Sequence, residues 1–264
     1  MKWNLLRSLL FLFPLSTWGI NSIGYDFSGN FSSEFLLDSS IGSGSWTQSS
    51  GVGNFTSTST VETESILIWK KYAAPYDSDW DVSLTITVPA FYDTDLADLD
   101  SGDEYVGAVL AVQYEDVDGL GGEYIATSGL SVSSFLGDSV TRDYYGEFIV
   151  DDSVAATFPD STAATTITAS LSFDATTKIL TAKGDGTTLY TLDVENGDPG
   201  WEMNSGDLFQ IGILGASNLN EVFVGNPITV DDLNQSGGTP IPEPAWIGAV
   251  LGVVALFLAR KRRS

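Results

Sequence analysis

Alternation of apolar and polar residues, interrupted by turn residues, is the feature that most constrains the fold of this chain. In its clearest run every second residue is apolar: Ile167, Ala169, Leu171 and Phe173. Successive side chains of a strand point to opposite faces, so this pattern predicts a half-buried strand. The triplet Gly184-Asp185-Gly186 is a tight hairpin signal, and it places the run within an antiparallel meander over Thr165–Val194.

The same pattern recurs along most of the chain. The further strands that it predicts are Glu64–Tyr72, Trp80–Val88, Glu104–Tyr114, Glu123–Val132, Asp143–Val150, Asp207–Ser217 and Pro227–Leu233. We count about eleven strands with short turns, no convincing helical periodicity and no repeat of fixed period. We therefore expect an all-β domain over residues 25–234, built as a two-sheet antiparallel β-sandwich of jelly-roll type.

The first residues have the form of a secretory signal. Lys2 and Arg7 form a positive region ahead of an apolar run, Leu9–Leu15, and small residues follow it. We expect a signal peptide in residues 1–24, cleaved after Gly19 or Gly24. An uncleaved N-terminal signal helix is the alternative, and either interpretation places the middle of the chain outside the cytoplasm.

Residues 241–264 combine three features in a fixed order. The triplet Pro242-Glu243-Pro244 precedes an uncharged apolar run, Ala245–Ala259, and a basic cluster ends the chain. The cluster consists of Arg260, Lys261, Arg262 and Arg263. Such a run can nearly span a bilayer as a helix, and the basic end stays cytoplasmic. We expect a linker at residues 235–240 and a transmembrane helix at 245–259, and a plain membrane anchor is the simplest alternative.

This order of features resembles the PEP-CTERM sorting signal of exported bacterial proteins. The resemblance covers residues 240–264 and implies that an exosortase, a membrane cysteine protease-transpeptidase, recognises the Pro-Glu-Pro triplet. It implies the export machinery and the exosortase as partners. It also implies an inner-membrane-anchored intermediate, then a cell-surface or extracellular protein associated with exopolysaccharide.

Charge and residue usage exclude several classes of function. The chain has 35 acidic and 11 basic residues, and six of the basic residues lie in the two terminal segments. The processed domain would therefore be strongly acidic, which excludes nucleic acid as a partner and suits a divalent-cation-rich matrix or a cationic partner. Solubility alone explains the acidity equally well. Without Cys or His, the chain lacks disulfides and the commonest general base and zinc ligand.

Three acidic clusters are candidate Ca²⁺ sites, because calcium is bound by several oxygen ligands. The favoured cluster is a Gly-containing loop with Asp93, Asp95, Asp98, Asp100 and Asp103. The other two are the row Asp77, Asp79 and Asp81, and the group Glu115, Asp116 and Asp118. None matches the full EF-hand pattern, and a solvated loop is the alternative. We expect no cofactor other than Ca²⁺.

A second resemblance concerns the central domain. Leu171–Gly186, Leu208–Leu214 and Ile228–Leu233 are similar to segments of concanavalin-A-like lectin/glucanase sandwiches. This resemblance implies glycan binding, and an immunoglobulin-like or galactose-binding jelly-roll sandwich is the main alternative. Trp201 follows a Gly-Asp-Pro-Gly loop and is the candidate for stacking on a sugar, whereas Trp69 and Trp80 lie in predicted strands and are expected in the core.

The glucanases of that sandwich class resemble one another through an E-x-D-x-E strand motif, which this chain lacks. Glu62 and Glu64 are close in sequence, but Thr63 lies between them. We therefore expect a non-catalytic β-sandwich at the cell surface or in the extracellular matrix, which either binds extracellular polysaccharide or simply fills the matrix. A diverged glycan-active hydrolase and a calcium-dependent adhesin module are the alternatives.

Overall fold

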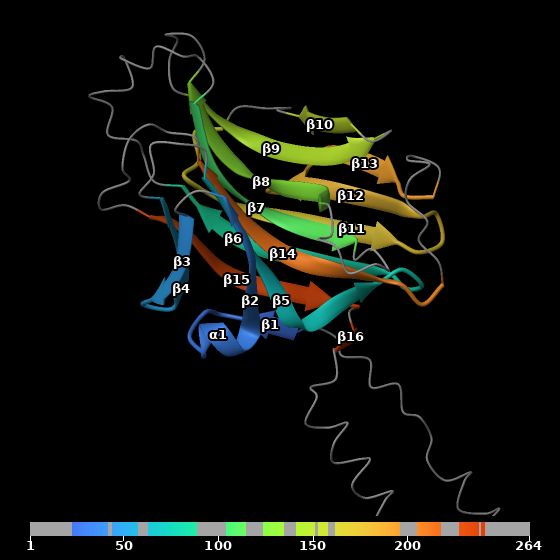
Figure 1. Cartoon of the computed structure of the whole chain (residues 1–264). Coiled ribbons are helices and arrows are strands. Elements are labelled where there is room, and N and C mark those ends of the chain that lie inside the picture. The colour runs from blue at the N-terminus through green and yellow to red at the C-terminus, as the bar shows by residue number, and fades with distance from the viewer. Residues whose placement is uncertain are drawn as a thin grey trace, which may run out of the picture.

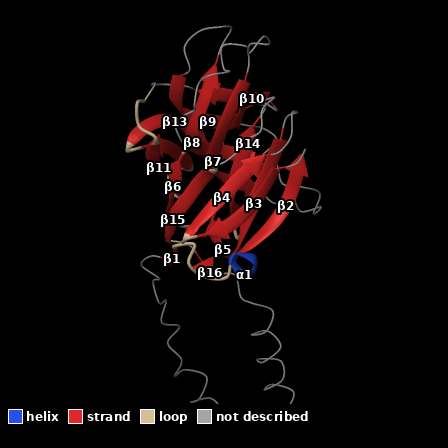
Figure 2. Ribbon diagram, turned by 90° about the vertical axis from the view of Figure 1, so that its left-hand side faces the viewer, coloured by secondary structure: helices blue, strands red, loops and turns tan. Residues whose placement is uncertain are grey.

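The computed structural model describes residues 23–41, 44–57, 63–88, 104–114, 124–134, 141–150, 153–157, 162–195, 205–217, 227–237 and 239–240. They form two antiparallel sheets that pack face to face (Figure 1). Nearly every element among them is a strand, and the short helix α1 (Phe31–Glu34) lies at one end (Figure 2). The prediction of an all-β, two-sheet antiparallel sandwich is confirmed.

The first sheet, sheet A, has the strand order β13-β12-β11-β6-β15-β4-β3, and β1 pairs with β15 beside this path. Its strands are β1 (Ile23–Tyr25), β3 (Gly44–Ser49), β4 (Val52–Ser57), β6 (Trp80–Thr87), β11 (Thr166–Asp174), β12 (Ile179–Gly184), β13 (Thr187–Asp193) and β15 (Ile228–Ser236). The predicted meander is confirmed as β11, β12 and β13, and it is joined to β6, which lies about 90 residues earlier in the chain.

The second sheet, sheet B, has the order β10-β9-β8-β7-β14-β5-β16, and β2 pairs with β5. Its strands are β2 (Phe35–Ile41), β5 (Thr63–Pro75), β7 (Glu104–Tyr114), β8 (Tyr124–Ser134), β9 (Thr141–Val150), β10 (Ser153–Thr157), β14 (Leu208–Ser217) and β16 (Thr239–Pro240). Every strand pair in both sheets is antiparallel, so the two sheets form an antiparallel sandwich.

The core lies between the sheets and contains the apolar residues that the alternation of apolar and polar positions predicts to point inward. The register joins Ile167 to Ile86, Ala169 to Leu84 and Leu171 to Val82, and all six side chains are buried. Trp69 and Trp80, which were expected in the core, are 1% and 3% exposed. Burial of apolar surface is the main stabilising contribution in a chain without disulfides.

Four strands before residue 60 were not predicted. The segment that forms β1 to β4 is rich in Ser, Gly and Thr, and its buried apolar side chains are all aromatic: Tyr25, Phe27, Phe35, Trp46 and Phe55. The ring centroid of Tyr25 lies 4.9 Å from that of Phe27 and 5.4 Å from that of Phe35. The Trp46 Nε1–H group donates a hydrogen bond to the carbonyl oxygen of Ser65 at 2.9 Å. β1 also pairs with β15, and Trp46 bonds to a residue of β5, so contacts with segments distant in sequence help to hold these strands, and a local pattern does not record them.

The sheets reach beyond the limits expected for the domain. Ile23 and Gly24 pair with Gln235 and Asn234 of β15, and β16 pairs with β5 within the segment expected as a linker. The segments expected to hold the signal helix, the sorting motif and the transmembrane helix fall in residues 1–22 and 241–264, outside the described residues. Within the described part, no helix is long and apolar enough to cross a membrane.

Pairing of β1 with β15 distinguishes the two expected signal-peptide cuts. A cut after Gly24 would remove two of the three β1 residues, whereas a cut after Gly19 would leave the strand whole. If a signal peptide is removed from this chain, we therefore expect the mature protein to begin at or before Ile23, which N-terminal sequencing would measure. A mature protein that begins at Tyr25 would contradict this prediction.

Candidate functional site

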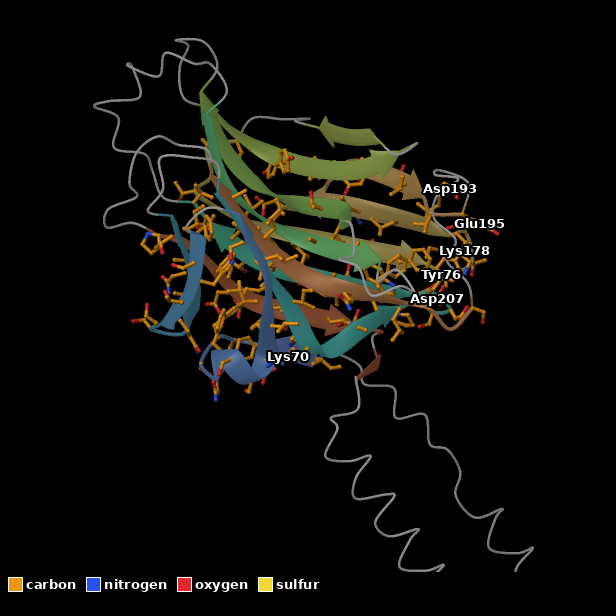
Figure 3. All side chains as sticks on the ribbon, viewed as in Figure 1. Lys70, Tyr76, Lys178, Asp193, Glu195 and Asp207 are labelled. Atoms are coloured by element: carbon orange, nitrogen blue, oxygen red, sulfur yellow. The ribbon has the colours of Figure 1, made fainter. Side chains whose placement is uncertain are left out.

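Three connections meet at one end of the sandwich, on the right in Figure 3. They are the β5–β6 turn, the β11–β12 turn and the segment that enters β14. The Tyr76 N–H group donates to the Asp207 carbonyl oxygen at 3.0 Å, and Asp77 Oδ2 accepts from the N–H group of Gly206 at 2.6 Å. Asp79 Oδ1 accepts a hydrogen bond from the N–H group of Ala175 at 2.9 Å. These bonds fix the connections relative to one another.

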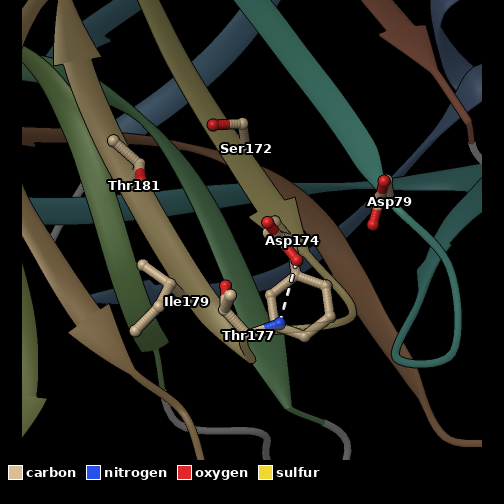
Figure 4. A pocket seen from close by; sticks show the side chains of 7 residues that line it. Asp79, Ser172, Asp174, Thr177, Ile179 and Thr181 are labelled. Atoms are coloured by element: carbon tan, nitrogen blue, oxygen red, sulfur yellow. Dashed lines mark hydrogen bonds between the residues drawn. The ribbon is translucent and has the colours of Figure 1, made fainter.

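An open groove of ≈ 350 Å³ lies at this end, on the outer face of sheet A. It is lined by Asp79, Ser172, Phe173, Asp174, Thr177, Ile179 and Thr181. Figure 4 shows hydroxyl side chains along β11, β12 and the turn between them, with carboxylates beside them. Its size lies at the lower end of the range for small-ligand sites, about 300–1,000 Å³.

The strand register sets the positions of the groove residues. Ser172 on β11 lies opposite Thr181 on β12, and Asp174 lies opposite Ile179. Because Phe173 points into the core and is only 3% exposed, its two neighbours in the chain point outward. The hydroxyl and carboxylate groups of the groove are thus held on paired strands, with an aromatic ring of the core beneath them.

The two carboxylates are held by backbone donors. Asp174 Oδ1 accepts hydrogen bonds from the N–H groups of Thr176 at 2.8 Å and Thr177 at 2.9 Å. The bond from Thr177, then that from Thr176, holds the pKa of Asp174 below the usual carboxyl value. This carboxylate therefore remains ionised at neutral and mildly acidic pH.

Lys178 is engaged beside the groove by an aromatic residue. Its backbone adopts a φ of 58°, and its Nζ donates to the Tyr76 carbonyl oxygen at 3.1 Å. The same Nζ lies 3.8 Å from the centroid of the Tyr76 ring, within the range of a cation–π contact. Burial raises the pKa of the Tyr76 phenol, and the negative charges of Glu195, Asp77, Asp193 and Asp207 raise it further. Tyr76 is therefore a neutral phenol at physiological pH.

The row Asp77, Asp79 and Asp81 does not form the predicted calcium site. Asp77 bonds to Gly206, Asp79 bonds to Ala175, and Asp81 pairs with Ser172 across the sheet. Among the described residues there is no group of three or more acidic side chains placed to hold a metal ion. Turn geometry separates these carboxylates, since each of the first two satisfies a different backbone donor.

The remaining candidate site residues lie outside the described residues. They are the calcium candidates Asp93, Asp95, Asp98, Asp100 and Asp103, the group Glu115, Asp116 and Asp118, the stacking candidate Trp201, and the terminal Pro-Glu-Pro and basic motifs. Sequence reasoning included Asp79, as a calcium ligand, but missed Ser172, Thr177 and Thr181. The polar residues at the outward positions of the predicted meander were the sequence signal that could have identified them.

Comparison with known proteins points to the fold. No protein-family model matches the chain, and no curated protein matches it. Among solved structures, the CBM2 module of the evolved Dit of Lactobacillus casei BL23 phage J-1 is similar, with a TM-score of 0.53 and 11% identity over 84% of this chain and 98% of that chain.

Two plant lectins are also similar, with lower scores. They are the metal-free form of lectin I-B4 from Griffonia simplicifolia (TM-score 0.47, 13% identity, 83% of this chain and 99% of that chain) and peanut lectin with a 9mer peptide (0.47, 14%, 84% and 98%). At these identities the likeness is one of fold. The chain is thus a two-sheet β-sandwich with a polar groove on the outer face of sheet A.

Proposed function

We propose that this protein is an exported, non-catalytic β-sandwich that binds glycan through the groove at the β11–β12 turn. The observation that carries this proposal is the lining of the groove, which places hydroxyls and carboxylates on paired strands. Sugar hydroxyls act as both donors and acceptors, so Ser172, Thr181 and Asp174 offer suitable partners. The partly buried Ile179 adds an apolar contact for the C–H groups of a sugar ring.

Two further observations support a surface glycan-binding role. The CBM2 module shares the fold, and its name places it among carbohydrate-binding modules. The secretory signal and the PEP-CTERM resemblance favour export, processing by an exosortase and contact with extracellular polysaccharide. Export machinery and exosortase are therefore the proposed partners during sorting, and extracellular polysaccharide is the proposed partner afterwards.

A diverged glycan-active hydrolase is the second candidate, because one groove contains two carboxylates. Glycoside hydrolysis needs one of them to be a protonated acid with a raised pKa. The lowered pKa of Asp174 suits the ionised carboxylate of such a pair and does not suit the protonated acid. Release of reducing sugar from a bound oligosaccharide, lost in Asp174→Asn, would support the hydrolase and contradict the non-catalytic proposal.

Replacement of Thr181 by valine should weaken glycan binding by roughly 2- to 10-fold, the range that corresponds to one net hydrogen bond. Valine keeps the shape and the strand preference of threonine and removes only the hydroxyl group. The purified full-length protein would first be screened on a glycan array, and the affinity for the best oligosaccharide would then be measured by calorimetry.

Thr229→Val is the matched control for this experiment. Thr229 also faces outward on sheet A, but it pairs with Thr87 at the far end of β6, about 20 Å from Asp81. The control should bind as the wild type does. A full-length protein that binds no glycan, or a Thr181→Val variant with unchanged affinity, would contradict the proposed site.

A further inference from the structure

The groove carries negative charge that the described residues leave uncompensated. Asp79 and Asp174 are both exposed, and neither makes an ion pair with any described residue. Lys178, next to the groove in sequence, is engaged by the carbonyl oxygen and the ring of Tyr76. Lys183 lies further along β12, where its charge acts on Asp81. Among the described residues, therefore, no cation forms an ion pair with these two carboxylates, since the nearby Lys178 and Lys183 are engaged by Tyr76 and Asp81.

Each kind of glycan would respond differently to this charge. An acidic polysaccharide would place like charges together, which is unfavourable. A neutral sugar would donate hydroxyl hydrogen bonds to Asp79 and Asp174, but it would bring no positive charge to the groove. A protonated amine on the sugar would also donate hydrogen bonds to the carboxylates, and its positive charge would add the attraction between opposite charges.

We propose that the groove binds an amino-sugar glycan whose amines are wholly or partly free of acetyl groups and carry positive charge. This inference rests on the proposed glycan-binding function and adds the class of ligand. The hydroxyls of Ser172 and Thr181 bind the sugar hydroxyls, Ile179 contacts the ring, and the ammonium group binds between Asp79 and Asp174. The net acidity of the chain adds long-range attraction for such a polycation.

The test compares three oligosaccharide probes of equal length on the purified full-length protein. They are chitosan oligomers with free amines, chitin oligomers with acetylated amines, and oligogalacturonates with carboxylates. At mildly acidic pH, where the glucosamine amine is protonated and Asp174 is ionised, chitosan oligomers should bind about tenfold more tightly than chitin oligomers. Oligogalacturonates should bind more weakly than either.

Three variants separate the groove from the general acidity of the protein. Asp79→Asn and Asp174→Asn keep an oxygen that accepts the backbone hydrogen bonds of Ala175, Thr176 and Thr177, and each removes one charge. Each should reduce the preference for chitosan over chitin several-fold. Asp231→Asn removes one charge elsewhere, on β15, and should leave the preference unchanged.

The possible results distinguish this inference from the function on which it rests. Equal binding of chitosan and chitin oligomers, both weakened by Thr181→Val, would overturn the amino-sugar assignment and leave glycan binding in place. The preference for chitosan could also fall equally in Asp79→Asn, Asp174→Asn and Asp231→Asn. That result would show non-specific attraction to the acidic protein and would also overturn the amino-sugar assignment. If none of the three oligosaccharide probes binds and the glycan array shows no ligand, both proposals are overturned.

Discussion

Replacement of Phe209 by alanine should lower the free energy of unfolding by about 3–5 kcal/mol, the usual cost of removing a buried aromatic ring. Phe209 lies on β14 of sheet B and is fully buried. Its ring centroid is 5.3 Å from that of Phe173 and 5.5 Å from that of Trp80, both on sheet A. Phe209 therefore joins the two sheets directly beneath the groove, and its loss leaves a cavity that paired strands cannot easily close.

The neighbouring residue provides a matched control for this prediction. Leu208 is also apolar and lies on the same strand, but it is 43% exposed. Leu208→Ala should lower the free energy of unfolding much less than Phe209→Ala does, because the Leu208 side chain buries little apolar surface. Urea unfolding followed by tryptophan fluorescence would measure both variants. Equal losses in the two would contradict the placement of this aromatic cluster in the core.

The strands beneath the groove are predicted well from the sequence, because apolar and polar residues alternate strictly along them. The predicted strand Trp80–Val88 is β6 in the structure, and the inward set on β11 packs as expected. One face of each of these strands is buried against the other sheet, so the two-residue period follows directly from burial. Where burial is carried by single aromatic rings, as at Phe27 and Phe55 before residue 60, the same period is absent and the strands were missed.

The groove was only partly predictable for a different reason. Asp79 is the middle residue of a row of three alternating aspartates, and this spacing predicts a metal site. In the structure Asp79 accepts a hydrogen bond from the N–H group of Ala175, which is 96 residues away in the chain. Ser172 and Thr181 are ordinary strand residues in sequence, and only the pairing of β6, β11 and β12 places them beside Asp79. The pairing register between strands distant in sequence creates this site, so the spacing of residues within one segment does not predict it.

Gly237 shows the same limit, because its environment comes from a distant segment. The sequence places it in a Gly-rich linker, yet it packs against the backbone at the start of β6. An added Cβ would lie 2.1 Å from the Asp79 carbonyl oxygen and 3.0 Å from Trp80 Cα. Its φ of 73° lies in the left-handed region, where a side chain is strained.

Replacement of Gly237 by alanine should therefore lower the free energy of unfolding by about 3 kcal/mol. Left-handed strain contributes about 1–2 kcal/mol and overpacking against rigid backbone about 1–3 kcal/mol. Gly186→Ala is the matched control, because Gly186 has a similar φ of 80° but nothing lies within 4 Å of the added Cβ. The control should show the strain alone, about 1–2 kcal/mol.

The two glycine variants should also differ in glycan binding. Relief of the clash at Gly237 must shift either its own segment or the backbone of Asp79, whose carboxylate lines the groove, whereas Gly186 has no such contact. We expect Gly237→Ala to weaken oligosaccharide binding several-fold at a temperature where it is still folded, and Gly186→Ala to bind as the wild type does. Equal unfolding free energies for the two variants would show that β6 tolerates the added methyl group. Unchanged binding in a destabilised Gly237→Ala variant would contradict this coupling between Gly237 and the groove.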